Sequence, residues 1–144
     1  MVKNHTDVTV PIHGGLYHST YIFLAMYICA KRGYTLKNPE SFSMMYKTPG
    51  IPDVYVEYKY KGKNEYDKTI DIKASVCIEI ETNMTKNACV KKAEQFTRSG
   101  MHEPIIIDMN RGFAKFKEDN ISRGVNYDND IEWAYQYIDY CIVL

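Results

Sequence analysis

The sequence has no net charge, because 18 lysines and arginines are matched by 18 aspartates and glutamates. Without an excess of positive charge there is no long-range field that attracts a polyanion, so a nucleic-acid site would have to rest on a local basic patch. Close pairs of cysteines are absent too, since the four cysteines are scattered along the chain. This spacing argues against a zinc or iron–sulfur site built from a cysteine cluster.

Long hydrophobic runs are also missing. The longest, residues 21–30, is about half of what a membrane-spanning helix needs. The first ten residues, MVKNHTDVTV, lack the apolar core of a signal peptide. We therefore expect an intracellular, cytoplasmic protein with reduced cysteines and no membrane segment.

The first half of the chain predicts one helix and two strands. Residues 16–32 are apolar nearly all round, which is typical of a helix packed on more than one side, within the fold or in a homodimer. Residues 34–50 are expected to be irregular or weakly extended. A Pro-Gly-Ile-Pro turn at 49–52 then leads into an alternating strand over 53–60, and residues 69–82 form a second alternating strand.

The second half predicts a helix over 84–98, followed by an all-apolar segment, 104–109, of the kind found in the middle of a sheet. A helical crossover makes this segment a parallel neighbour of the preceding strand. The tail is expected to hold a basic loop and a last helix over 131–140. Together these elements predict an α/β fold, a single-domain α/β/α sandwich with a mixed central sheet, whose core covers about 16–109 and whose C-terminal part covers 110–144.

Three carboxylates fall at one end of this predicted sheet. Asp53 begins the first strand of a hairpin, and Glu79 and Glu81 end the second strand on a shared face. Antiparallel pairing brings these strand ends together. Hard divalent cations prefer oxygen ligands, and a metal ion held beside a phosphodiester activates water and neutralises the developing charge. The pattern is that of a metal-dependent nuclease; the alternative is that the acidic side chains are simply solvated.

The arrangement as a whole resembles the PD-(D/E)XK nuclease superfamily, which includes restriction endonucleases and archaeal Holliday-junction resolvases. Five segments between about residues 16 and 109 carry the resemblance. They are a helix ending in Lys-Arg-Gly-Tyr34, the turn Gly-Ile-Pro-Asp53, the strand Cys-Ile-Glu79-Ile-Glu81-Thr, the helix TKNACVKKAEQF and the strand Pro-Ile-Ile-Ile-Asp108. Pro52-Asp53 stands at the PD position and Glu79 at the (D/E) position. Glu81 stands where the superfamily usually has lysine, although some restriction enzymes look similar, with Glu-x-Glu there.

The resemblance implies a restriction endonuclease-like fold and an endonuclease that uses Mg²⁺ or Mn²⁺ to cleave DNA, including branched or structured DNA. Asp53, Glu79 and Glu81 would be the metal ligands. Lys92 and Gln95, three residues apart on the predicted 84–98 helix, are candidates to replace the missing lysine, because related nucleases often use a lysine or glutamine there. The alternative is that Lys92 is an ordinary solvated residue.

A second candidate for the lysine is Lys73, which with Asp71 forms Asp-Ile-Lys and matches the motif literally. The length of the hairpin turn distinguishes the two registers. A tight turn near Gly62 would pair Asp53 with about Lys73, whereas a longer loop through 65–68 would pair it with about Glu81. We favour the longer loop, because a metal ligand is expected where a strand ends, and Lys73 would be in mid-strand.

Other residues extend the predicted site. His18, on the first helix, could approach the carboxylates. The predicted basic loop holds the cations most suited to contact phosphates, and two phenylalanines suited to stack on unpaired bases: Arg111, Lys115, Lys117, Arg123, Phe113 and Phe116. The alternative here is an ordinary mobile loop. A second reading of the whole chain is a catalytically silent, nuclease-like module of a mobile element or virus that binds nucleic acid or a protein.

Overall fold

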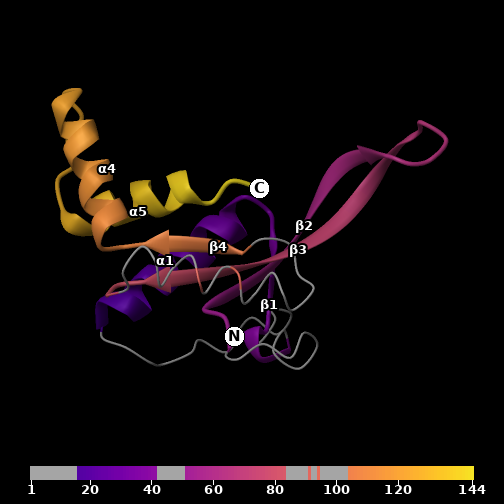
Figure 1. Cartoon of the computed structure of the whole chain (residues 1–144), viewed down its shortest axis with the longest axis horizontal. Coiled ribbons are helices and arrows are strands. Elements are labelled where there is room, and N and C mark those ends of the chain that lie inside the picture. Colours follow the sequence, from indigo (N-terminus) through magenta and orange to yellow (C-terminus); the bar gives the residue numbers. More distant parts are fainter. Residues whose placement is uncertain (1–15, 42–50, 84–90, 92–93, 95–103) are drawn as a thin grey trace.

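The computed structural model describes residues 16–41, 51–83, 91, 94 and 104–144 (Figure 1). The fold is mixed α/β, as the sequence predicts. The helices and strands follow in the order α1 (Leu16–Lys31), β1 (Thr35–Lys37), β2 (Val54–Lys63), β3 (Thr69–Glu81), β4 (Ile105–Asp108), α4 (Arg111–Ser122) and α5 (Asp130–Cys141). Among these described residues, no helix is long and apolar enough to cross a membrane.

The four strands form one mixed sheet in the order β1-β2-β3-β4. β2 runs antiparallel to both β1 and β3, and β3 runs parallel to β4, which confirms the predicted parallel pair. The expectation that the apolar segment at 104–109 lies in the middle of the sheet is wrong, because β4 is an edge strand of the described sheet. Its apolar composition has another cause: α4 and α5 pack against it, and Ile107 is fully buried.

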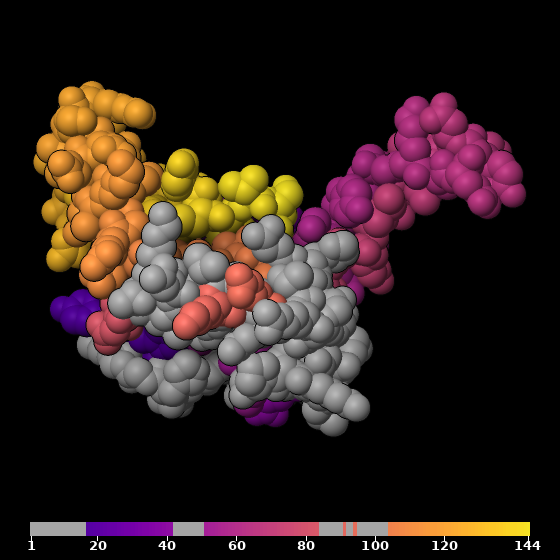
Figure 2. Space-filling view, viewed as in Figure 1, coloured from indigo at the N-terminus to yellow at the C-terminus, as the bar shows by residue number. Residues whose placement is uncertain are grey.

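The β2–β3 hairpin is longer than predicted and reaches away from α4 and α5 as an arm (Figures 1 and 2). β2 continues to Lys63, and the turn is closed by the side chain of Asn64, which accepts hydrogen bonds from the N–H groups of Tyr66 (2.9 Å) and Lys68 (3.0 Å). The tight turn near Gly62 does not occur. Gly62 lies inside β2, where a Cβ would come within 2.2 Å of the Ile72 side chain, so glycine makes room for that isoleucine.

The hydrophobic core lies between one face of the sheet and helices α1 and α5. Alternate side chains of the strands point into it, which is the period-two pattern expected of a sheet with one face in the core: Val54, Val56, Val76, Ile78, Ile80 and Ile107. Ile22 and Ile28 of α1 and Trp133 and Ile138 of α5 pack against them. Burying one such aliphatic side chain contributes about 1.5–3 kcal/mol. α1 also exposes Tyr17, Phe23 and Tyr27, and the homodimer remains a prediction.

The segment predicted to be a basic loop is helix α4, so this expectation is wrong. Its phenylalanines, Phe113 and Phe116, lie three residues apart on one helical face, and each ring lies 5.3 Å from the ring of Tyr137 in α5. The Asp108 carboxylate accepts hydrogen bonds from the N–H groups of Asn110 (2.8 Å) and Gly112 (3.2 Å) at the start of the helix. Packing on α5 and this acceptor stabilise a helix where charge dominates the local composition.

The predicted helix over 84–98 lies outside the described residues except for Lys91 and Glu94, which are helical and exposed. Lys92 and Gln95 therefore also lie outside the described part of the chain. The described helices α1 and α5 pack on one face of the sheet. The helix predicted to cover the other face of the sandwich is the one over 84–98, so this part of the prediction falls on residues outside the described ranges.

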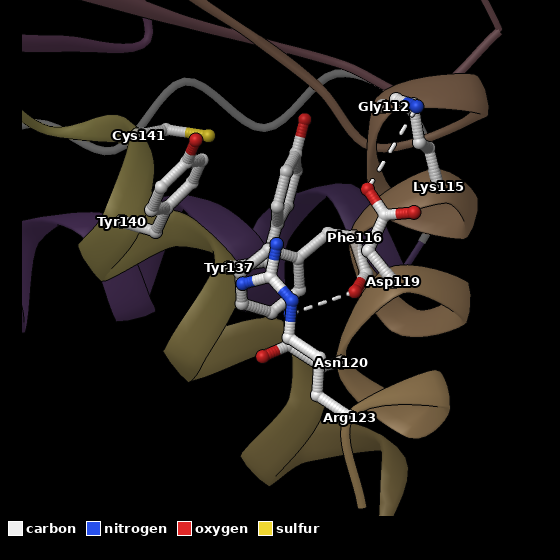
Figure 3. A pocket seen from close by; sticks show the side chains of 9 residues that line it. All are labelled: Gly112, Lys115, Phe116, Asp119, Asn120, Arg123, Tyr137, Tyr140 and Cys141. Atoms are coloured by element: carbon white, nitrogen blue, oxygen red, sulfur yellow. Dashed lines mark hydrogen bonds and ion pairs between the residues drawn. The ribbon is translucent and has the colours of Figure 1, made fainter. Parts of the chain in front are cut away.

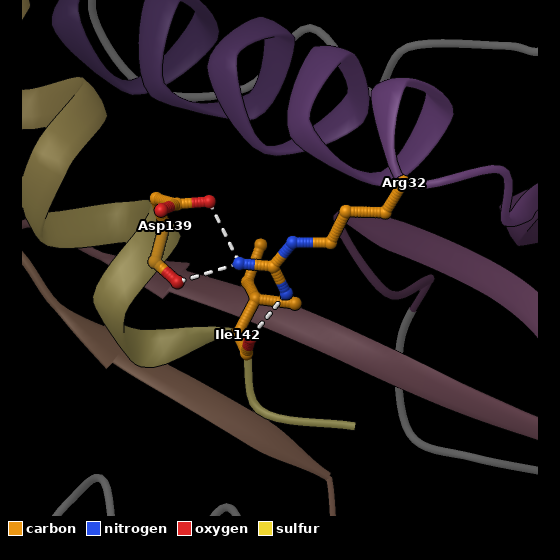
Figure 4. A network of polar contacts seen from close by, with 3 residues as sticks. All are labelled: Arg32, Asp139 and Ile142. Atoms are coloured by element: carbon orange, nitrogen blue, oxygen red, sulfur yellow. Dashed lines mark hydrogen bonds and ion pairs between the residues drawn. The ribbon is translucent and has the colours of Figure 1, made fainter.

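Arg32, directly after α1, ties this helix to the end of α5 (Figure 4). Its guanidinium donates to the carbonyl oxygen of Asp139 at 2.8 Å, to the Asp139 carboxylate at 2.7 Å, and to the carbonyl oxygen of Ile142. The last carbonyls of a helix have no partner within it, so Arg32 satisfies groups that would otherwise need water. Partial burial lowers the pKa of Arg32, but the hydrogen bond and charge of Asp139 outweigh this effect and raise the pKa above its ordinary value.

Arg32→Ala is expected to lower the free energy of unfolding by roughly 1–3 kcal/mol, because hydrogen bonds to a charged group are lost together with the partner of two carbonyls. Lys61→Ala is the matched control, since it removes an exposed ion pair with Asp71 on the hairpin arm. That loss is expected to be below about 1 kcal/mol. Urea unfolding measures both, and equal losses would mean that Arg32 contributes no more than a surface ion pair.

Candidate functional site

The candidate site lies where β2 begins and β3 ends. The first pair of the hairpin ladder is Val54 opposite Ile78, so Asp53 and Glu79 are the next positions on the two strands. Both carboxylates are buried, with exposed fractions of 2% for Asp53 and 3% for Glu79. The longer hairpin loop is thus the observed one. Asp53, however, lies opposite Glu79, two residues before the expected partner Glu81.

The alternative register, with Lys73 opposite Asp53, is wrong. Lys73 pairs across the hairpin with Lys59 and forms an ion pair with Glu57 at 3.6 Å. Asp71 lies further out on the arm, where it pairs with Lys61. The hydrogen bond and the charge of Lys61 lower the pKa of Asp71. Lys73 and Asp71 therefore belong to the arm and not to the end of the sheet where Asp53 and Glu79 lie.

β3 extends past the start of β2, and there the side chains of Asp53 and His18 form the hydrogen bonds with its backbone. Oδ2 of Asp53 accepts a hydrogen bond from the N–H of Ile80 at 2.8 Å. Nε2 of His18, from α1, donates to the carbonyl oxygen of Ile80 at 3.0 Å and lies 3.4 Å from Oδ2 of Asp53. Buried peptide groups need partners, and here two side chains take the place of a neighbouring strand. The structure thus brings His18 to Asp53, as the sequence suggested.

Glu79 and Glu81 lie on the face of the sheet opposite the core, because side chains alternate and Ile78 and Ile80 point into the core. Glu81 is half-buried and lies opposite Asp108 in the parallel ladder of β3 and β4. Among the described residues, no three histidine, cysteine, aspartate or glutamate side chains are grouped so that they could hold a metal ion. The burial of Glu79 and Asp53 nevertheless rules out the reading of these two as ordinary solvated acids.

The buried thiol next to this site is chemically quiet. Burial, and to a lesser degree the charge of Glu79, raises the pKa of Cys77 well above its ordinary value. Burial likewise raises the pKa of Cys29, in α1, to about 11. Thiols with such pKa values stay protonated at neutral pH and are poor nucleophiles. The described cysteines, Cys29, Cys77 and Cys141, are free.

The four predicted phosphate-contacting cations all lie on or next to α4. Arg111, Lys115 and Arg123 are exposed, and the ammonium of Lys117 lies 4.3 Å from the centre of the Phe113 ring. Lys115 and Arg123 line a cavity of about 480 Å³ between α4 and α5 (Figure 3). Phe113 is buried against Tyr137, so its predicted role in stacking on bases is wrong. The sequence does not indicate Tyr137 and Tyr140 as part of a site, because only the packing of α5 on α4 brings them to the cavity.

Asp53→Ala is expected to lower the free energy of unfolding by about 1–3 kcal/mol, because the N–H of Ile80 loses its buried acceptor. Asp53→Asn keeps an acceptor oxygen in the same place, so its loss is expected to be smaller, below about 1 kcal/mol. Urea unfolding of the two variants side by side measures the difference. If both unfold like the unchanged protein, Asp53 does not stabilise the end of β3.

The site consists of two buried carboxylates, a histidine held beside one of them, and a third carboxylate, Glu81, opposite Asp108 of β4. Comparison of the sequence with protein-family models, with curated proteins and with solved structures finds no match. One fold can host many functions, so the chemistry of these side chains is what indicates the function.

Proposed function

We propose that this protein is a divalent-metal-dependent endonuclease that hydrolyses phosphodiester bonds of DNA. The observation that carries the proposal is the burial of two carboxylates, Asp53 and Glu79, at adjacent strand ends, with exposed fractions of 2% and 3%. Acidic side chains are almost never buried so deeply without a compensating partner, and buried ionisable groups concentrate at functional sites. Asp53 has a structural role as acceptor for the N–H of Ile80, but that hydrogen bond does not require a second buried carboxylate beside it, and two neighbouring carboxylates are a donor set that suits a hard cation.

The order of the elements supports the same proposal. α1, β2, β3 and β4 follow one another in the order that the resemblance to the PD-(D/E)XK superfamily implies, with Pro52-Asp53 directly before β2 and Glu79 near the end of β3. The proposal includes the restriction endonuclease-like sandwich, in which the predicted helix over 84–98 would cover the face of the sheet opposite α1. In that arrangement Lys92 and Gln95 would orient phosphate or water.

The residues present suit a small, hard cation. Magnesium is commonly held by only one or two protein carboxylates, with water and substrate oxygens completing its coordination, so Asp53 and Glu79 are enough to hold Mg²⁺ or Mn²⁺. Glu81, on the same face, would add negative charge from the edge of the site. When bound, such an ion supplies water of lowered pKa and offsets the charge of the phosphate. The chain's own contribution is positioning: the N–H of Ile80 and the ring of His18 fix the direction of the Asp53 carboxylate.

A second candidate is a catalytically silent module with the same architecture that binds nucleic acid or a protein, as part of a mobile element or virus. It is favoured by Glu81, which stands in the place of the usual lysine, and by the zero net charge of the chain. Both candidates predict the same fold. They differ in whether a bound metal ion leads to cleavage.

Metal binding is the first test. Magnesium or manganese is expected to raise the melting temperature of the unchanged protein, because a ligand that binds only the folded state stabilises it. Asp53→Asn and Glu79→Gln keep the size of the side chains, remove one charge each, and are expected to abolish the response. Glu57→Gln, which changes an acid on β2 that pairs with Lys73, should keep it. If neither metal changes the melting temperature of the unchanged protein, the proposal is contradicted.

Cleavage is tested on supercoiled, single-stranded and branched DNA with magnesium, manganese or a chelator. Asp53→Asn and Glu79→Gln are each expected to lower the rate by a factor on the order of a hundred or more, as when one preorganised electrostatic group is lost. Binding of DNA by the unchanged protein without cleavage in either metal would favour the silent module.

Glu81→Gln and Lys73→Ala, assayed side by side, test which residue completes the site. Glu81→Gln removes charge on the face that holds Glu79 and is expected to lower cleavage by a factor on the order of a hundred. Lys73→Ala is expected to cleave at the normal rate, since Lys73 lies on the hairpin arm opposite Lys59. An inactive Lys73→Ala with an active Glu81→Gln would reverse the assignment.

A further inference from the structure

The cavity between α4 and α5 has an aromatic wall that reaches the solvent (Figure 3). The ring of Phe116 lies 5.4 Å from that of Tyr140 and 5.3 Å from that of Tyr137. Trp133 supports Phe116 from behind, edge-on at 6.3 Å. Tyr140 is nevertheless 67% exposed. Aromatic rings held in place with an accessible face are surfaces on which a nucleobase stacks.

The same cavity carries cations at its rim. Arg123, directly after α4, lies about two turns from Lys115 and lines the same cavity, so the phosphates of one strand could contact both. Asp119 lies between them and 3.7 Å from Lys115, so the rim has two cations against one carboxylate. Asn120 adds an amide to the wall, fixed by a hydrogen bond from Nδ2 to the carbonyl oxygen of Phe116 at 2.8 Å. Amide groups recognise the polar edges of bases.

The floor of the cavity is joined to the end of the sheet that holds the carboxylates. The Tyr137 hydroxyl donates to the carbonyl oxygen of Asp108 at 2.8 Å, and the N–H of Gly112 donates to the Asp108 carboxylate at 3.2 Å. Asp108 is in turn the β4 partner of Glu81 in β3. In Figure 1, α4 starts at the end of the sheet where the β3 and β4 arrows finish. Asp108 therefore links the wall of the cavity to the strand that carries Glu79 and Glu81.

From these features we infer that the cavity binds an unpaired nucleotide of the DNA strand, with its base against Tyr140 and Phe116 and its phosphates beside Lys115 and Arg123. The inference rests on the proposed function for its choice of DNA as the ligand. Bases inside a duplex are stacked on one another and cannot use such a wall without leaving the helix. The substrate class is therefore DNA with a single-stranded segment, such as an overhang, a flap or the arm of a branched molecule.

Binding is measured in a chelator, which prevents cleavage, with a single-stranded oligonucleotide of about 12 nucleotides and with the blunt duplex of the same sequence. The single tryptophan of the chain, Trp133, is buried edge-on against Phe116 of the cavity wall, so a base that stacks on Phe116 is expected to change the fluorescence of Trp133. The unchanged protein is expected to bind the single strand more tightly than the duplex, with a change in Trp133 fluorescence. Equal affinity for both, or no fluorescence change on binding, would overturn the inference.

Tyr140→Ala is expected to weaken single-strand binding about tenfold, as for the loss of one stacked base. Tyr140→Leu, which keeps apolar bulk but not the flat ring, should weaken it similarly. Arg123→Gln is expected to lower the salt dependence by about one phosphate contact. The matched controls lie on the hairpin arm: Tyr66→Ala, at a tyrosine that is 74% exposed, and Lys63→Gln should bind like the unchanged protein. Equal effects of the Tyr140 and Tyr66 variants would overturn the inference.

Failure of this inference and failure of the nuclease proposal give different results. If Asp53→Asn combined with Glu79→Gln loses cleavage while its single-strand affinity and its dependence on Tyr140 are unchanged, both are supported. If the unchanged protein cleaves DNA but Tyr140→Ala alters neither binding nor preference for single strands, the cavity inference alone is overturned. If Tyr140-dependent binding is found without cleavage in either metal, the nuclease proposal alone fails.

Discussion

The register of the β2–β3 hairpin determines where every charged group of the candidate site lies. Side chains alternate along a strand, so a shift by one residue would turn Glu79 into the hydrophobic core and Ile78 and Ile80 out of it. Ten consecutive pairs, from Val54 opposite Ile78 to Lys63 opposite Thr69, hold the observed register. Ile80 lies just past the Val54–Ile78 end of this ladder, where the Asp53 carboxylate accepts a hydrogen bond from its N–H. The burial of an acid at this point thus follows from the hydrophobic pattern of the core.

α1 carries this constraint to the rest of the molecule. His18, near its start, contacts Asp53 and the carbonyl oxygen of Ile80, and Arg32, just after its end, holds the last carbonyls of α5. These two positions are 14 residues apart, which is about 21 Å along a helix at 1.5 Å per residue. Ile22 and Ile28 fix the helix on the sheet between them. The carboxylate end of the sheet and the C-terminal helix are therefore connected through one rigid element.

The sequence predicts the helices and strands whose buried side chains form an apolar pattern, but it does not predict hydrogen bonds between side chains and backbone groups. β3 follows from its alternating apolar residues, α1 from a run of apolar residues that a helix packed on more than one side requires, and the parallel pairing of β4 from the crossover rule. The length of the hairpin does not follow from such a pattern, because its outer part reaches away from α4 and α5. β2 continues there through the polar residues Lys61 and Lys63. α4 was missed because Asp108, the acceptor at its start, also ends a strand. The role of His18 depends on the carbonyl of Ile80, which no side-chain pattern reveals.

The C-terminal helices lie outside the segments on which the nuclease proposal rests, yet they contact the same end of the sheet. Gly112 has no side chain, and a Cβ there would come within 2.3 Å of the Tyr137 oxygen and 3.3 Å of the Asp108 Cβ. Only glycine therefore allows the Tyr137 hydroxyl to reach the carbonyl of Asp108, opposite Glu81. Burial, foremost, raises the pKa of that hydroxyl, so it remains a hydrogen-bond donor over the whole neutral range. The same tyrosine lines the cavity between α4 and α5, so one hydrogen bond connects the aromatic wall to the strand that pairs with β3 at Glu81.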